Sequence, residues 1–135
     1  MIGRSTSTTA IIIFAHGARE AAWAKPFHKL KEIIQARHAT VELAFLELMQ
    51  PSLETAVNGL VRQGIKKIKV VPVFFGEGGH LKKHVPSIID AVRSTYPGLV
   101  IQLAKPVGEA EPILEAIANY ALQTVSETKN DEEHL

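Results

Sequence analysis

The chain has 135 residues and a formal net charge of +1, from 15 basic and 14 acidic residues. This length suits one domain with one hydrophobic core. Hydrophobic residues make up 46% and charged residues 21%, as in soluble globular proteins. The balanced charge gives no general attraction to nucleic acid or membranes. The chain has no cysteine, which excludes disulfides and thiolate metal sites.

The two ends of the chain are polar. We expect a loose tail over residues 1–9, a single domain over 10–125 and a disordered polar tail over 126–135. The first apolar run is too short to span a bilayer, and the start lacks the apolar segment and cleavage site of a secretory signal. A cytoplasmic protein is therefore expected.

Four apolar runs are typical of strands that are buried on both faces of a parallel sheet. They cover residues 10–15, 41–48, 66–75 and 99–104. Pro72 lies in the third run and has no amide proton to donate. We therefore expect it near a break in the strand pairing or at its end.

Four amphipathic helices are expected, because apolar residues recur at spacings of three and four. Their expected spans are about 20–37, 51–64, 81–95 and 111–125. The expected core face of the last helix consists of Ile113, Leu114, Ile117, Tyr120, Ala121 and Leu122.

Proline and glycine indicate where two of these helices begin or end. Pro26 falls inside the first helical pattern and marks either a late start or a local kink. Pro51 suits the first turn of the second helix, and Gly64 suits its end.

Strand and helix alternate four times along the chain. This predicts an α/β fold, a three-layer sandwich with a four-stranded parallel sheet and helices on both faces. In such sheets, ligands bind beyond the carboxyl ends of the strands. The segments expected at those ends are AHGAR, LELMQP, GEGGH and KPVGEAEP.

Two histidines are expected at this edge. His16 follows the first strand, and His80 follows the third strand, behind Gly78 and Gly79. These glycines allow a tight turn and leave space above the sheet. Either histidine alone could simply cap a helix or lie at the tip of a flexible loop. Together they indicate a site for Fe, Co, Ni or Zn ions, which neutral imidazole binds.

A carboxylate and several basic residues are expected near the histidines. Glu47 ends the second apolar run, where a carboxylate is costly to bury unless it is paired or ligated. It is either a solvated strand end or, beside two histidines, a third metal ligand or proton acceptor. A substrate with several carboxylates would give a role to the basic side chains of Arg19, Lys82, Lys83 and Lys105.

His84 lies four residues after His80, on the same face of the expected helix. The pair lacks the glutamate of the HExxH motif, so a zinc protease has weak support. We expect His84 to support the site from behind or to lie at the surface.

The segments FAHGAR, VELAFLELMQPSL, VVPVFFGEGGHLKKHVP and AKPVG together resemble the small, single-repeat sirohydrochlorin chelatases. These are class II chelatases of cobalamin and siroheme synthesis. The resemblance spans about residues 10–122. No single motif decides it, but the order and spacing of the motifs are specific.

The resemblance implies a chelatase-like fold and the insertion of a metal ion into sirohydrochlorin, a tetrapyrrole with eight carboxylates. The ion is a substrate, Co2+ or Fe2+ with Ni2+ as a further candidate, and no organic cofactor is implied. His16 and His80 match the metal-binding histidines, and Glu47 matches a glutamate that handles metal or protons. These three are the implied catalytic residues, in a protein that is expected to be a homodimer.

The substrate contacts expected for such a reaction lie in the same loops. Arg19 and Lys82 would hold the rim carboxylates, and Gly78 and Gly79 would border a flat apolar opening together with Phe74 or Phe75.

The sequence departs from the family pattern at two places. Ala18 replaces the serine of the common HGSR motif, which removes one hydroxyl from the site. His84 stands where the family often has an acidic residue, before Val85 and Pro86, and this could alter the metal preference.

Other classes of protein remain as alternatives. A non-catalytic carrier of metal or tetrapyrrole on the same fold is compatible with every motif. A histidine phosphatase would need an arginine where Ala15 stands, and an α/β-hydrolase would need a G-x-S-x-G elbow, which is absent. No G-x-G-x-x-G opens the first helix, so a dinucleotide site has little support.

Overall fold

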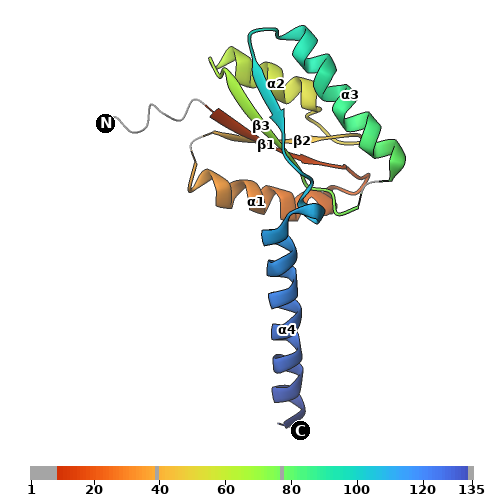
Figure 1. Cartoon of the computed structure of the whole chain (residues 1–135). Helices are drawn as coiled ribbons and strands as arrows, with labels where there is room; N and C mark the ends of the chain where they lie inside the picture. The colour runs from red at the N-terminus through yellow and green to blue at the C-terminus, as the bar shows by residue number, and fades with distance from the viewer. Residues whose placement is uncertain (1–8, 39, 77, 134–135) are drawn as a thin grey trace.

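The structure is a computed structural model, and it describes residues 9–38, 40–76 and 78–133 (Figure 1). The expected loose N-terminal tail lies outside the described residues, apart from Thr9, which already belongs to the first strand. Among the described residues, no helix is long and apolar enough to cross a membrane.

Four parallel strands form one sheet, as the sequence predicts, and their order in the sheet is β2-β1-β3-β4. Three of the strands, β2, β3 and β4, are shorter than the apolar runs that contain them, whereas β1 begins one residue before its run. The ladder between β1 and β3 ends at Pro72, as expected for a residue without an amide proton. The strands are β1 (Thr9–Ala15), β2 (Val41–Phe45), β3 (Lys67–Pro72) and β4 (Val100–Leu103).

Helices cover the sheet on both sides, with α1 below it and α2 and α3 above it in Figure 1. Two short 3-10 turns, η2 (Ala21–Ala24) and η3 (Val107–Glu109), precede the first and last helices. The helices are α1 (Lys25–Gln35), α2 (Leu53–Arg62), α3 (Gly79–Thr95) and α4 (Glu111–Glu133).

The sheet separates two hydrophobic clusters, because successive side chains of a strand point to opposite faces. Phe14 of β1 and Val70 of β3 lie in the larger cluster, under α2 and α3. Ile13 of β1 and Leu43 of β2 lie in the smaller cluster, against α1. The sheet is thus held firmly from both sides near β1 and β2.

One helix start decides between two stated alternatives, and another differs from the expectation. Pro26 lies in the first turn of α1, which resolves the earlier alternative in favour of a late start. Pro51 was expected in the first turn of α2, and this was wrong. The helix begins at Leu53, because the Ser52 hydroxyl caps it by accepting the Thr55 N–H at 3.2 Å. Gly64 follows the end of α2 with a φ of +90°, as a terminating glycine should.

The last helix differs most from the expectation. Its apolar face was expected to be part of the core, but the described side chains of α4 are exposed except for the half-buried Thr124. α4 projects away from the sheet, and it continues to Glu133, through most of the expected disordered tail (Figure 1). The sequence pattern correctly predicts an amphipathic helix but not the absence of a surface beneath it.

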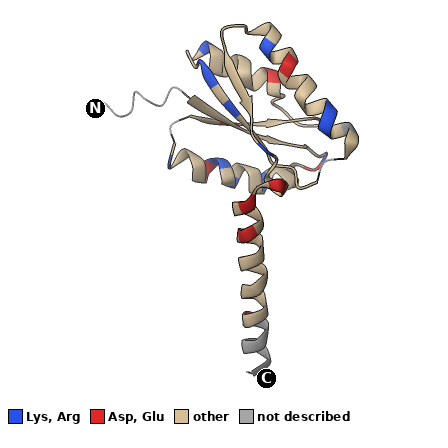
Figure 2. Ribbon diagram, viewed as in Figure 1, with Lys and Arg blue, Asp and Glu red and all other residues tan. Residues whose placement is uncertain are grey.

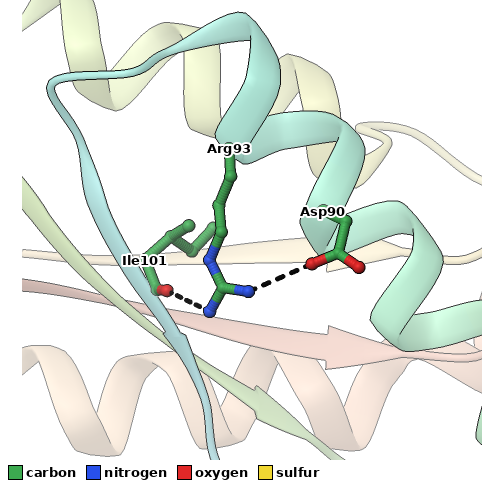
Figure 3. A network of polar contacts seen from close by, with 3 residues as sticks. All are labelled: Asp90, Arg93 and Ile101. Atoms are coloured by element: carbon green, nitrogen blue, oxygen red, sulfur yellow. Dashed lines mark hydrogen bonds and ion pairs between the residues drawn. The ribbon is translucent and has the colours of Figure 1, made fainter.

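Arg93 fastens α3 to the edge strand β4 (Figure 3). Its guanidinium donates to the backbone carbonyl of Ile101 at 2.8 Å and to the Asp90 carboxylate at 3.1 Å. Edge strands leave backbone carbonyls without strand partners, and this side chain satisfies one of them.

Arg93→Ala should lower the free energy of unfolding by about 1 kcal/mol, mainly through the lost bond to the partly buried carbonyl. The ion pair with Asp90 is exposed, so Asp90→Ala should change stability by less than about 0.5 kcal/mol. Urea denaturation measures both values. Arg62→Ala is the matched control, because Arg62 makes no polar contact with any described residue. Equal losses for Arg93→Ala and Arg62→Ala would contradict the role of Arg93.

Candidate metal and substrate site

The candidate site lies at the carboxyl ends of the strands. His16 directly follows β1, and Glu47 comes two residues after β2. β1 and β2 are neighbours in the sheet, with Ala15 opposite Phe45 at the last paired position. Adjacent parallel strands therefore deliver the two side chains to the same place.

Backbone pairing continues past the ends of these strands and fixes the two residues. The Leu46 N–H donates to the Ala15 carbonyl at 2.9 Å, and the Glu47 N–H donates to the His16 carbonyl at 3.1 Å. Above these bonds, His16 Nε2 lies 3.2 Å from Glu47 Oε2. His16 and Glu47, which the sequence places at the same edge of the sheet, thus lie in direct contact there.

Gly17 allows the two loops to approach closely. Its φ is +100°, a conformation that residues with a side chain rarely adopt. A Cβ added there would lie 1.8 Å from the Glu47 carbonyl oxygen. The glycine of the HG motif is therefore required by the contact that positions Glu47.

The histidine and the carboxylate are both accessible. The side chain of His16 is 48% exposed and that of Glu47 is 56% exposed. Their hydrogen bond requires a proton on Nε2 of the imidazole, with the carboxylate as acceptor. The buried Phe74 supports the pair from below, with its ring centre 6.1 Å from that of His16 in an edge-on arrangement. A nitrogen and an oxygen ligand are thus presented together to solvent.

His80 is the second residue of α3, at the same edge of the sheet. Its side chain lies outside the described part of the chain, as does Glu77. Within the described residues, no three His, Asp or Glu side chains gather as a metal site. His84 lies on the next turn of α3 and its side chain is exposed at the surface. Of the three residues predicted as metal ligands, the structure describes the side chains of two, His16 and Glu47, and these two lie together.

Two large apolar side chains stand exposed at this edge. Phe75 is 64% exposed, whereas its neighbour Phe74 is buried, so Phe75 is the one of the two whose side chain faces solvent. Leu48 is 59% exposed and has a φ of +65°, which is unfavourable for a leucine. The sequence analysis did not single out Leu48, because a leucine at the end of an apolar run reads as part of a strand.

The basic residues that were expected near the site are solvent-exposed. Lys82 and Lys83 lie in the first turns of α3, visible in Figure 2 as basic positions on that helix. Arg19 follows β1, and Lys105 follows β4. These four side chains are exposed and make no hydrogen bond or ion pair with His16 or Glu47, so solvation alone accounts for them in the single chain.

Two pockets formed by described residues lie at opposite ends of the strands. The larger, about 340 Å³, is lined by residues at the amino ends of β3 and β4, including Lys66 and Tyr96, and contains no site residue. The smaller, about 260 Å³, lies beside the site and is lined in part by His28, Phe45 and Met49. The chemistry of the ligands, rather than pocket size, therefore locates the site.

The sequence profile of the CbiX family matches residues 10–124 of the chain. The chain belongs to the CbiX family. The match covers both loops of the His16–Glu47 pair and the segment from Gly78 to Lys82. It confirms the resemblance to small class II chelatases that the motifs indicate.

Relatives in the CbiX family carry chelatase names. A protein of Saccharolobus islandicus (strain L.S.2.15 / Lassen #1), named sirohydrochlorin cobaltochelatase, is 31% identical over 126 residues, which are 89% of this chain and 95% of the relative. A protein of Bacillus subtilis (strain 168), named sirohydrochlorin ferrochelatase, is 34% identical over 111 residues. That alignment covers 80% of this chain but only 42% of the Bacillus protein.

A solved structure confirms the predicted fold class. The crystal structure of a CbiX protein from Marinobacter aquaeolei VT8, assigned to cobalamin (vitamin B12) biosynthesis, is 34% identical to this chain. It superimposes with a TM-score of 0.81 over 88% of this chain and 98% of its own. The α/β arrangement with a four-stranded parallel sheet is therefore the arrangement of the CbiX family.

Proposed function

We propose that this chain is a sirohydrochlorin chelatase that inserts Co2+ or Fe2+ into the macrocycle. The named relatives are a cobaltochelatase and a ferrochelatase of sirohydrochlorin. The observation that carries the proposal within this structure is the exposed His16–Glu47 pair, with 3.2 Å between Nε2 and Oε2.

In this proposal the metal ion is held first by the protein. The imidazole nitrogen of His16 and the carboxylate of Glu47 are ligands of the kinds that Co2+ and Fe2+ accept, and His80 is proposed as a third ligand. An ion between His16 and Glu47 takes the place of the proton that now joins them. Few protein ligands hold the ion loosely enough for release to the macrocycle.

Proton balance gives the carboxylate a second role. Two pyrrole N–H protons leave sirohydrochlorin as one divalent cation enters, so the charge of the macrocycle core is unchanged. Glu47 becomes free to accept one of these protons when the ion moves, and His16 can accept the other. The same pair would thus deliver the metal and receive protons.

The macrocycle is proposed to lie over the edge of the sheet. Gly78 and Gly79 leave open space there, since a Cβ added at either would meet no atom within 4 Å. The exposed side chains of Phe75 and Leu48 offer apolar contact to a flat ring. Arg19 and Lys82 are proposed to hold carboxylates at its rim.

The proposal includes a homodimer in the cytoplasm. The chain matches only 42% of the longer Bacillus relative, so two copies of this chain approximate the length of one such protein. The reducing cytoplasm is also where Fe2+ persists as a substrate.

The test is the absorbance of sirohydrochlorin with purified protein and Co2+, Fe2+ or Ni2+, one metal at a time. We expect a spectral shift faster than the spontaneous reaction for Co2+ or Fe2+. The control omits the protein and keeps the metal concentration the same. Tight binding of sirohydrochlorin without faster insertion for any metal would instead indicate a carrier.

A further inference from the structure

The most unusual surface of the chain is the apolar face of α4. Six of its side chains are between 38% and 68% exposed: Ile113, Leu114, Ile117, Tyr120, Leu122 and Val125. Monomeric proteins rarely expose so many neighbouring apolar side chains. A helix also obtains most of its stability from packing of its apolar face. The face of α4 is therefore suited to contact with another surface.

A second unoccupied surface lies on the sheet. α1 packs against β1 and β2, whereas no described helix covers the same face of β3 and β4 around Lys67 and Lys69, where the side chains are exposed. On that face Lys67 is paired in register with Val100, and Lys69 with Gln102. All four side chains are exposed, and the Lys69 ammonium donates to the Gln102 amide oxygen at 2.8 Å. Parallel sheets are normally covered on both faces.

The two surfaces match in size and charge. α4 carries Glu111, Glu115 and Glu127 beside its apolar face, whereas the open face of the sheet carries Lys67 and Lys69. Figure 2 shows acidic positions at the start of α4 and basic positions on the sheet. Lysine stems and Val100 provide apolar contact area, while the ammonium groups can reach carboxylates. A helix is about 10 Å wide, as are two neighbouring strands.

The start of α4 is held against the body of the chain by several backbone contacts. The Gly108 N–H donates to the Phe74 carbonyl at 3.1 Å, and a Cβ at Gly108 would lie 1.8 Å from the Phe75 carbonyl oxygen. The Ala110 N–H donates to Val107, and the Ile113 N–H donates to Ala110. These contacts fix the direction in which α4 leaves the body (Figure 1).

We propose that α4 of one copy packs on the open β3–β4 face of a second copy, and that the exchange is reciprocal. This inference rests on the proposed homodimer and specifies its interface. From Glu111 to Val125 the helix is about 22 Å long, and half of its surface is about 350 Å². Two exchanged helices and the two faces they cover would bury about 1,400 Å² in total, which is enough for a stable dimer.

Substitution on α4 tests the interface. We expect the full chain to be a dimer at micromolar concentration by light scattering or sedimentation. Ile117→Asp should raise the dimer dissociation constant at least tenfold, because it places a charge in the centre of the apolar face. Asn119→Asp is the matched control, because residue 119 lies on the opposite side of the same helix and carries the same new charge. It should leave the dimer unchanged.

Cross-linking identifies the surface that α4 contacts. The natural chain has no cysteine, so single cysteines can be placed without background. A chain with Ile117→Cys should join a separately tagged chain with Val100→Cys through a short bis-maleimide, but not one with Ser87→Cys on α3. A chain with both Ile117→Cys and Val100→Cys that cross-links within itself at high dilution would show packing on its own sheet and overturn the proposal.

The outcomes separate this inference from the proposed function. A monomeric natural chain would overturn both the helix exchange and the homodimer. If that monomer still inserted metal into sirohydrochlorin, the proposed chelatase function would be unaffected. A dimer that survives Ile117→Asp and shows no link between residues 117 and 100 would overturn the exchange alone.

Discussion

His16→Ala should slow metal insertion into sirohydrochlorin by about 100-fold or more. The substitution removes the nitrogen ligand and one proton acceptor, and general acid–base groups alone contribute about 10²-fold to 10⁴-fold. His16 is half-exposed and its side chain is not part of either hydrophobic cluster, so the fold should be retained. The initial rate of the absorbance change with Co2+, at saturating sirohydrochlorin, measures the effect.

His38→Ala is the matched control for this substitution. His38 lies at the opposite end of the sheet, where Nε2 contacts the Thr9 carbonyl at 2.8 Å. Its loss should cost about 1 kcal/mol of stability and leave the rate unchanged. Equal rates for the His16→Ala and natural proteins would remove His16 from the mechanism.

The pair can also be tested as a unit. If His16 and Glu47 hold the same ion, Glu47→Gln and His16→Ala should not be additive. The double variant should then be about as slow as the slower single variant, as found for residues that act together. If the two rate losses instead multiplied in the double variant, His16 and Glu47 would serve separate steps.

Gly17→Ala should lower the free energy of unfolding by about 3 kcal/mol or more and the melting temperature by roughly 10 °C. The backbone φ of +100° is strained for alanine, and the new Cβ would lie 1.8 Å from the Glu47 carbonyl oxygen. Relief of this overlap requires the loops after β1 and β2 to separate. Thermal unfolding followed by circular dichroism measures the loss.

Gly59→Ala provides the contrast with Gly17→Ala. Gly59 lies in the middle of α2, and a Cβ there would meet no atom within 4 Å. Alanine should stabilise that helix by about 0.5–1 kcal/mol. If both substitutions shifted the melting temperature in the same direction, the close approach at Gly17 would not be the cause.

The strands could be predicted from the sequence because their apolar runs are long and continuous. AIIIFA and the residues around Val70 can be stable only when covered on both faces. Their ends were less well predicted, since β2 stops at Phe45 and the backbone turns at Leu48 with a φ of +65°. Apolar side chains that face a loop cannot be distinguished by pattern from those that face the core.

From the sequence, the site could be located only at the edge of the sheet where the strands end. Sequence order places His16, Glu47 and His80 after successive strands, but it does not state which strands are neighbours. The order β2-β1-β3-β4 makes β1 and β2 adjacent, and this brings His16 to Glu47. The role of Gly17 becomes visible only when the second loop is in place.

The apolar face of α4 shows a different limit. The spacing of Leu114, Ile117 and Ala121 correctly predicts a helix with one apolar side. It does not specify whether that side covers the same chain or another one. The expected core face is therefore exposed in the single chain.

If His16 and Glu47 hold the ion as proposed, their half-exposed position should affect the kinetics of metal transfer. An ion held there would keep several water molecules, since about half of each side chain faces solvent. Pyrrole nitrogens can replace these water molecules one at a time, and the protein need not open. Ligand exchange at the ion would then limit the rate, so Fe2+ and Co2+, which exchange water rapidly, should be inserted faster than the more inert Ni2+.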